Sequence, residues 1–175
     1  MVLIAGAVVL LEVSGRVQVS PPVRPEIRWL GGALLVVAAL VLVVGTVVTG
    51  SGPHSGDAEQ PARFGFDPQT VSWLHADLVF LFLGLALATV LALRVTDAPG
   101  RAQRRAAALL AVIVAQGAVG YVQYFTGVPA ALVALHMLGA CLVVITTVRL
   151  ALALFAESVP ADEARSQLAT ADRAR

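Results

Sequence analysis

The chain has 175 residues, of which 58% are hydrophobic and 13% are charged, and its mean hydropathy is +0.86. Soluble globular domains carry about 25% charged residues, so this composition excludes an ordinary water-soluble domain and favours a membrane protein. The net charge of +1 gives no sign of a nucleic-acid partner, and we expect none.

The first residues are apolar but too short to cross a membrane alone. Residues 1–11 (MVLIAGAVVLL) end at Glu12 and lack the basic region and the cleavage site of a signal peptide. Two interpretations are open for residues 1–15: an interfacial or partly inserted segment, or the end of a transmembrane helix whose beginning is missing. We favour the second. Residues 16–28 are then a cytoplasmic loop, and residues 157–175 are a polar cytoplasmic tail.

Four later segments are each long enough to span a bilayer, because about 20 residues cover roughly 30 Å of hydrocarbon. The segments are residues 29–49, 71–93, 106–126 and 130–156. Arg149 near the end of the last segment can extend its charge to the interface. The sequence therefore predicts an all-α fold, a polytopic four-helix membrane bundle over residues 29–156.

The cations, all of them arginine, predict the orientation of this bundle. They concentrate before the first span and between the second and third spans, as Arg16, Arg24, Arg28, Arg94, Arg101, Arg104 and Arg105. By the positive-inside rule, these connections and the C-terminal tail are cytoplasmic. The loop of residues 51–70 and the turn at residues 127–129 then face outward. Both ends of the four-span bundle are expected in the cytoplasm, in a multi-pass protein of the cell membrane.

Two histidines, His75 and His136, lie a few residues inside the second and fourth spans. Both spans run from outside to inside, so at about 1.5 Å per residue both imidazoles lie roughly 6–10 Å below the outer face. Ionisable groups at such depth are rare and usually functional. A metal ion alone takes three or four ligands, whereas a haem needs only two axial ones. The pair therefore predicts haem ligation, over the alternative that each ring hydrogen-bonds a neighbouring helix.

Small residues near the histidines have two interpretations. They are Gly84, Ala86 and Ala88 in the second span, Gly117 and Gly120 in the third, and Gly139 and Ala140 in the fourth. They leave room for a flat macrocycle, or they simply allow close packing of membrane helices.

Four strings, in this order, resemble the haem A synthase family, and more narrowly its C-terminal half. They are VVTGSGPHSGD leaving the first span, LHADLVF around His75, QGAVGYVQYFTGVP in the third span and LVALHMLGA around His136. The resemblance covers roughly residues 1–156. Family members generally have eight spans in two similar four-helix halves, each with a histidine pair. The resemblance thus explains residues 1–11 as the end of the fourth span of a missing first half.

The resemblance implies an oxidoreductase that converts the methyl group of the substrate haem O to the formyl group of haem A, for terminal oxidases. His75 and His136 would be the axial, metal-binding ligands of a haem B that serves electron transfer. The implied partners are the lipid bilayer, haem, and the missing N-terminal half or a second copy of this chain.

Two departures from the family leave the catalytic residues unknown. In the family's first half a glutamate three residues before the histidine is a catalytic candidate, and the matching position here is Ser72. Many members have a cysteine pair in an outer loop, whereas the single cysteine here, Cys141, lies in the last span. This chain therefore lacks that acid and cannot form an internal disulfide.

Other polar residues have roles that the sequence leaves open. Gln116 lies mid-span, and we expect it to bond a helix backbone or side chain. Asp77 lies roughly 200° around its helix from His75 and cannot bond that imidazole directly; it either has a function or pairs with Gln123 or a nearby tyrosine of the third span.

His54 and Arg63 lie in the outer loop. Contact with haem propionates is one interpretation for both. Solvation is the other, which we favour.

Two other classes of function are alternatives to the synthase. A non-enzymatic b-type membrane electron carrier would use the same histidine pair without chemistry on the haem. A membrane transporter or structural subunit would need no haem.

Overall fold

The computed structural model describes residues 1–13, 23–53 and 63–155, and the regular structure in these ranges is entirely α-helical. The helices are α1 (Val2–Val13), α2 (Pro25–Ser51), α3 (Pro68–Val95), α4 (Gly100–Phe125) and α5 (Ala130–Phe155). The last four are long and apolar enough to cross a membrane. The predicted polytopic four-helix fold is therefore confirmed.

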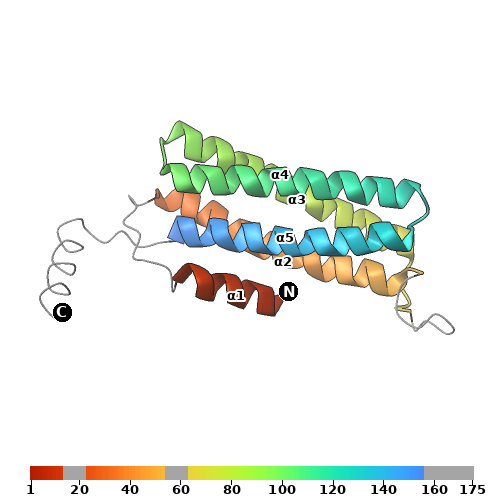
Figure 1. Cartoon of the computed structure of the whole chain (residues 1–175). Helices are drawn as coiled ribbons and strands as arrows, with labels where there is room; N and C mark the ends of the chain where they lie inside the picture. Colours follow the sequence, from red (N-terminus) through yellow and green to blue (C-terminus); the bar gives the residue numbers. More distant parts are fainter. Residues whose placement is uncertain (14–22, 54–62, 156–175) are drawn as a thin grey trace, which may run out of the picture.

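Helices α2 to α5 form an up-down-up-down bundle (Figure 1). Each helix packs against the next in the chain, and α2 packs against α5 to close the ring. Helices α3 and α5 are parallel and lie on a diagonal, since no Cα atom of one is within 8 Å of a Cα atom of the other. Side chains from these two helices can therefore meet only across the centre of the bundle, where helical bundles build their cofactor sites.

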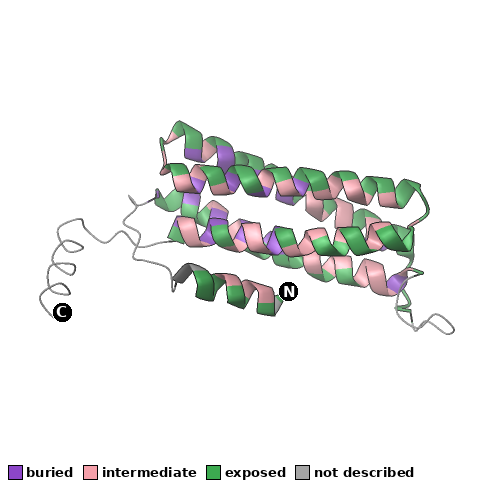
Figure 2. Cartoon of the chain, viewed as in Figure 1, coloured by how far each residue is buried: buried purple, intermediate pink, exposed green. Residues whose placement is uncertain are grey.

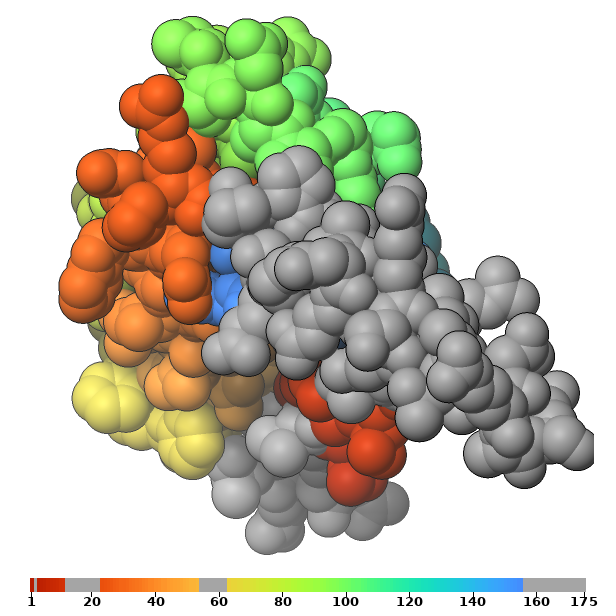
Figure 3. All heavy atoms as spheres, turned by 90° about the vertical axis from the view of Figure 1, so that its left-hand side faces the viewer, coloured from red at the N-terminus to blue at the C-terminus, as the bar shows by residue number. Residues whose placement is uncertain are grey.

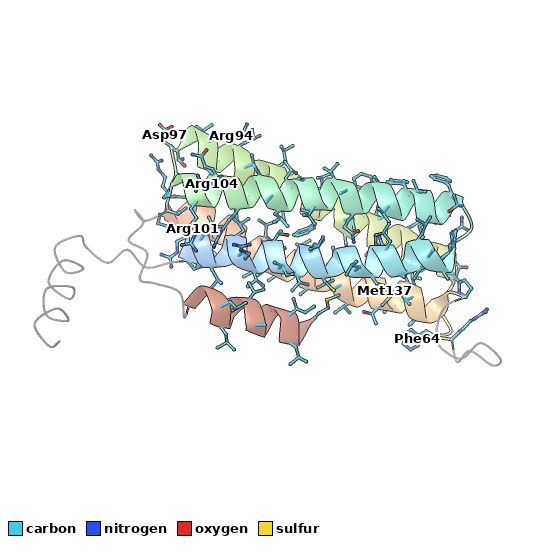
Figure 4. All side chains as sticks on the ribbon, viewed as in Figure 1. Phe64, Arg94, Asp97, Arg101, Arg104 and Met137 are labelled. Atoms are coloured by element: carbon cyan, nitrogen blue, oxygen red, sulfur yellow. The ribbon has the colours of Figure 1, made fainter. Side chains whose placement is uncertain are left out.

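The two ends of the bundle differ in chemistry. We call the end where α3 and α5 begin the histidine end, and the opposite end, where α2 and α4 begin, the arginine end. Arg94, Asp97, Arg101 and Arg104 lie together at the arginine end (Figure 4). Viewed onto that end (Figure 3), the α3–α4 turn and α1 lie at opposite edges of the molecule.

Helix α1 runs alongside α5, with its C-terminal end toward the arginine end (Figure 1). Its direction is thus close to that of the bundle axis. Whether it is the end of a longer transmembrane helix stays a prediction.

Fully buried side chains fill the arginine half of the bundle, whereas the histidine half is mostly half-buried and exposed (Figure 2). The largest buried side chains are Leu34, Phe82, Leu93, Leu109, Leu150 and Leu154. Toward the histidine end this core stops at Val41, Phe82, Ile113 and Val143, one residue from each helix. Because lipid chains are as apolar as leucine, close van der Waals packing rather than exclusion from water holds these helices together.

The helix that contains the third predicted span, residues 106–126, is longer than that span at its N-terminal end. Helix α4 begins at Gly100, so Arg101, Arg104 and Arg105 lie on its first turns rather than in a connecting loop. Charge marked the end of the apolar run, but arginine is a good helix former and does not end a helix. The Arg105 Nη1 atom donates to the backbone carbonyl of Arg149 on α5 (2.6 Å), which ties the two helices at this end.

Local signals fix the start of α3, the helix that carries His75. The Asp67 carboxylate accepts hydrogen bonds from the Thr70 hydroxyl (2.7 Å) and the Thr70 backbone N–H (2.8 Å), and Pro68 opens the first turn. This is an N-cap, which satisfies a helix donor that has no partner within the helix. The same two bonds hold the pKa of Asp67 below its usual value. The cap sets where α3 begins, and hence the depth of His75.

Candidate functional site

The imidazole of His75 is half-buried and lies against Gly45 of α2. A Cβ atom added at Gly45 would be 3.1 Å from Cε1 and 3.5 Å from Nδ1 of the ring. The ring also interacts with the backbone carbonyl of Val41, one turn before Gly45. Only glycine leaves the ring this close to α2 without displacement, so Gly45 forms a notch for His75.

The imidazole of His136 has an equivalent seat on the other helix pair. It is half-buried against Gly120 of α4, where an added Cβ atom would be 3.3 Å from Cε1 and 3.7 Å from Nδ1. The pairs α2–α3 and α4–α5 thus each contribute one histidine and one glycine. In both pairs Cε1 is the ring atom nearest the glycine, and Nδ1 is the nearer of the two ring nitrogens.

The structure brings the two histidines together from diagonal helices. His75 lies about 10 Å along α3 from its first residue and His136 about 9 Å along α5, and both helices start at the histidine end. The rings are close enough to interact electrostatically. Each Nδ1 atom is buried and has no hydrogen-bond partner. Two half-buried imidazoles with unpaired nitrogens therefore lie at matched depth on diagonal helices.

The pair sits just beyond the packed core. His75 precedes the core residue Phe82 by seven residues, and His136 precedes Val143 by the same interval, which is two helical turns. Between the core and the histidine end, the described residues of the four long helices include only two buried ones, Ser51 and Val71. The helices are therefore tightly packed below the imidazoles and less tightly packed around them.

Gln116 links α4 to the backbone of His136. Its Nε2 atom donates to the His136 carbonyl (2.9 Å), as expected for a mid-span polar residue that needs a partner. Its amide group also contacts Gly139 of α5 and occupies the place that a Cβ atom would need there. The prediction that Gln116 bonds a helix backbone or side chain is thus confirmed, with the backbone as the partner. Gly139 serves close helix packing and does not leave room for a macrocycle.

Most of the other small residues that the sequence singled out also lie away from the histidine rings. Gly84 and Ala88 are exposed on the outer surface of α3, and Ala86 is buried in the core. Nothing lies within 4 Å of a Cβ atom added at Gly84 or at Gly117. Of the glycines that the sequence singled out, only Gly120 touches a histidine ring.

Replacing Gly139 with alanine should lower the thermal unfolding midpoint in detergent. The added methyl group displaces the Gln116 amide and breaks its hydrogen bond to the His136 carbonyl, which costs about 1 kcal/mol. Gly84→Ala is the control, because Gly84 is exposed and alanine is the better helix former. Equal midpoints for the two variants would show that the Gln116 bond does not hold α4 to α5.

The polar residue Asp77 does not form the pairing that the sequence suggested. Its side chain is exposed on α3 and makes no hydrogen bond within the described part of the chain. The Oε1 atom of Gln123 is buried and is also unpaired. Ser72, one turn before His75, donates its hydroxyl to the Pro68 carbonyl (2.6 Å), so it is occupied with its own helix.

The outer-loop residues contribute little to the described site. Arg63 is exposed beside Phe64, whose ring packs on Gly50 at the histidine end (Figure 4). His54 lies outside the described residues. Cys141 is half-buried on α5, and its thiol faces the Met137 carbonyl at 3.6 Å.

The donor set is a pair of imidazoles rather than a larger metal cluster. Within residues 1–13, 23–53 and 63–155, no group of three or more histidine, cysteine, aspartate or glutamate side chains could hold a metal ion. Two neutral imidazoles can, however, donate to one metal from opposite sides. Chemically, the site suits a cofactor that supplies its own remaining ligands.

Sequence reasoning missed one residue of this site, Gly45. Gly45 lies in the first span at a depth similar to that of His75 in the second, and this match was the available signal. Comparison of the chain with protein-family models, curated proteins and solved structures gives no match.

Proposed function

We propose that His75 and His136 bind one haem B through its two axial positions. The observation that supports this most directly is the placement of two half-buried imidazoles at the same depth on parallel, diagonal helices. Helices that do not touch along their length leave the centre between them to the side chains. A flat macrocycle whose iron takes one ligand from each face matches this arrangement.

The ring orientations also suit haem. In each histidine Nδ1 is nearer than Nε2 to the flanking glycine: at Gly45 the distances from an added Cβ atom are 3.5 and 3.9 Å. At Gly120 only Cε1 and Nδ1 of His136 come within 4 Å. In each ring Nε2 is therefore the nitrogen farther from the flanking glycine. A ring that binds a metal through Nε2 carries its proton on Nδ1, on the side that faces α2 or α4 here.

We further propose that the chain acts as the electron-transferring, bis-histidine half of a haem A synthase. A haem held on both faces has no open iron position, so it supplies one-electron transfer rather than oxygen activation. His75 and His136 hold it, and the core beginning at Phe82 and Val143 closes the site on the arginine side. Ser72 offers no carboxylate beside His75, and its hydroxyl is bonded to Pro68. Oxidation of haem O is therefore assigned to the other half of the enzyme.

The proposed orientation follows the positive-inside rule, with the arginine end in the cytoplasm and the histidine end outward. Arg94, Arg101 and Arg104 lie together at the first end (Figure 4). At the second end, the described Arg63 lies four residues from the acidic Asp67. Haem would then sit nearer the outer face of the membrane.

The haem proposal is tested by the absorption spectrum of the full chain purified in detergent. We expect a reduced-minus-oxidised difference spectrum with the sharp band of a low-spin b-type haem, at one haem per chain. A preparation that takes up no haem when haem is supplied would contradict the proposal. The transporter or structural class would then stand.

A b-type electron carrier is the second candidate, and the bonded Ser72 hydroxyl in place of an acid is what favours it. Haem extracted from cells that make haem O and this chain separates the two. Haem A in the extract would support the synthase. Haem O alone, with an intact low-spin band in the purified chain, would show that the chain transfers electrons without oxidising the substrate by itself.

A further inference from the structure

One stripe of α4 faces α5 around His136. Gln116, Gly120 and Gln123 follow one another at intervals of four and three residues, so they share one helical face. Gln116 bonds the His136 carbonyl, and Gly120 touches the His136 ring. Gln123 is the next residue along the same stripe, one turn from Gly120 toward the histidine end. Its side chain is therefore directed to the part of α5 that carries His136.

Two unpaired atoms lie on this interface. The Oε1 atom of Gln123 and the Nδ1 atom of His136 are both buried, and neither has a hydrogen-bond partner. The Nδ1 atom is on the side of the ring that faces α4, 3.7 Å from the Cβ position of Gly120. One atom is an acceptor, and the other becomes a donor whenever Nε2 is engaged. Buried polar atoms normally have partners, so two complementary unpaired atoms on facing helices indicate a bond that forms in a different state of the ring.

We propose that Gln123 is a positioning residue for His136, and that its Oε1 atom accepts a hydrogen bond from Nδ1–H when Nε2 holds the haem iron. This inference rests on the proposed haem ligation. Neutral imidazole carries a single ring proton, so a ring that donates Nε2 to a metal must carry that proton on Nδ1. Histidines that bind metals almost always donate this second N–H to an acceptor, which fixes the ring orientation. Gln116 does not serve here, because its amide is held to the His136 carbonyl and packed on Gly139.

The two ligands then differ in their support. The Nδ1 atom of His75 is also unpaired, and the acceptor beside that ring is the backbone carbonyl of Val41, which no side-chain substitution removes. His136 depends on a side-chain amide. A substitution of Gln123 therefore alters one axial ligand and leaves the other unchanged.

The test compares Gln123→Met and Gln123→Glu in the haem-loaded full chain. Methionine removes the acceptor at similar size, so haem should bind about 10–100-fold more weakly and its midpoint potential should rise. Glutamate is a stronger acceptor, so the midpoint potential should fall. The low-spin electron paramagnetic resonance signals of the two variants should shift in opposite directions from that of the original chain. Gln103→Met is the matched control on the same helix. The Gln103 Nε2 atom bonds the Ala98 carbonyl (2.8 Å) near the arginine end, so this change should leave the haem as in the original chain.

The outcomes separate this inference from the haem proposal. An original chain without a low-spin haem band would contradict the haem proposal itself. A normal band in the original chain, together with potentials and signals in both Gln123 variants that match those of Gln103→Met, would overturn the role of Gln123 alone. If Gln123→Met does not take up haem, Gln123→Glu decides: a shifted potential supports the bond, and an unshifted one refutes it.

Discussion

Replacing either His75 or His136 with alanine should abolish the low-spin band of the bound haem. His75 and His136 are the only histidines among the described residues, so each removal leaves one axial position of the proposed haem without its imidazole. A haem with one strong axial ligand becomes high-spin. Loss of a ligand should also weaken binding by more than the roughly 10–100-fold that loss of a ligand's supporting partner costs. The double variant should bind no haem at all.

The measurement is the difference spectrum of each variant, with circular dichroism to verify that the helices are intact. Added imidazole should restore the low-spin band in His136→Ala, because the side-chain deletion leaves space beside Gly120. His54→Ala is the control, since it removes the third histidine of the chain. A two-ligand site predicts an unchanged band for this control. Low-spin haem in His75→Ala or His136→Ala without added imidazole would show that a different residue ligates the iron.

The matched depth of the two histidines could be predicted from the sequence, because it depends only on the rise of an α-helix per residue and on the alternating direction of the spans. The rise of an α-helix per residue is constant. Alternating spans force α3 and α5 to start at the same end, and each histidine follows its helix start by a similar number of residues. What the sequence could not supply is the diagonal placement of α3 and α5, which depends on how the four helices close into a ring.

The glycine contacts were harder to predict, because they depend on the rotation of each helix about its own axis. Gly139 shares a helical face with His136, and that rule alone suggested space for a cofactor. In the structure this face is covered by Gln116 of the neighbouring helix. Gly45 and Gly120, which do touch the imidazoles, lie on the helices before them in the chain. Apolar spans of nearly uniform hydrophobicity carry little information about which side faces which neighbour.

Enlarging the glycine notches should displace the imidazoles and disturb the haem without removing a ligand. A Cβ atom at Gly45 would be 3.1 Å from the His75 ring, and one at Gly120 would be 3.3 Å from the His136 ring. Contacts this short require the ring to move by a few tenths of an ångström. Gly45→Ala and Gly120→Ala should therefore keep the haem with a shifted potential. The shift should be larger at Gly45, where the contact is shorter.

Valine at either position adds two further carbon atoms toward the ring, and overpacking of this kind costs about 1–3 kcal/mol. Gly45→Val and Gly120→Val should therefore lose most of the low-spin band, as measured by redox titration and absorption at equal protein concentration. Gly117→Val is the matched control on α4, because nothing lies within 4 Å of its Cβ position and the same β-branched residue enters the same helix. If Gly117→Val disturbs the haem as much as Gly120→Val does, the disturbance comes from placing a β-branched residue in α4 and not from contact with the His136 ring. A normal band in both Gly45→Val and Gly120→Val would mean that the imidazoles bind haem from positions away from these glycines, since valine and the ring cannot occupy the same notch.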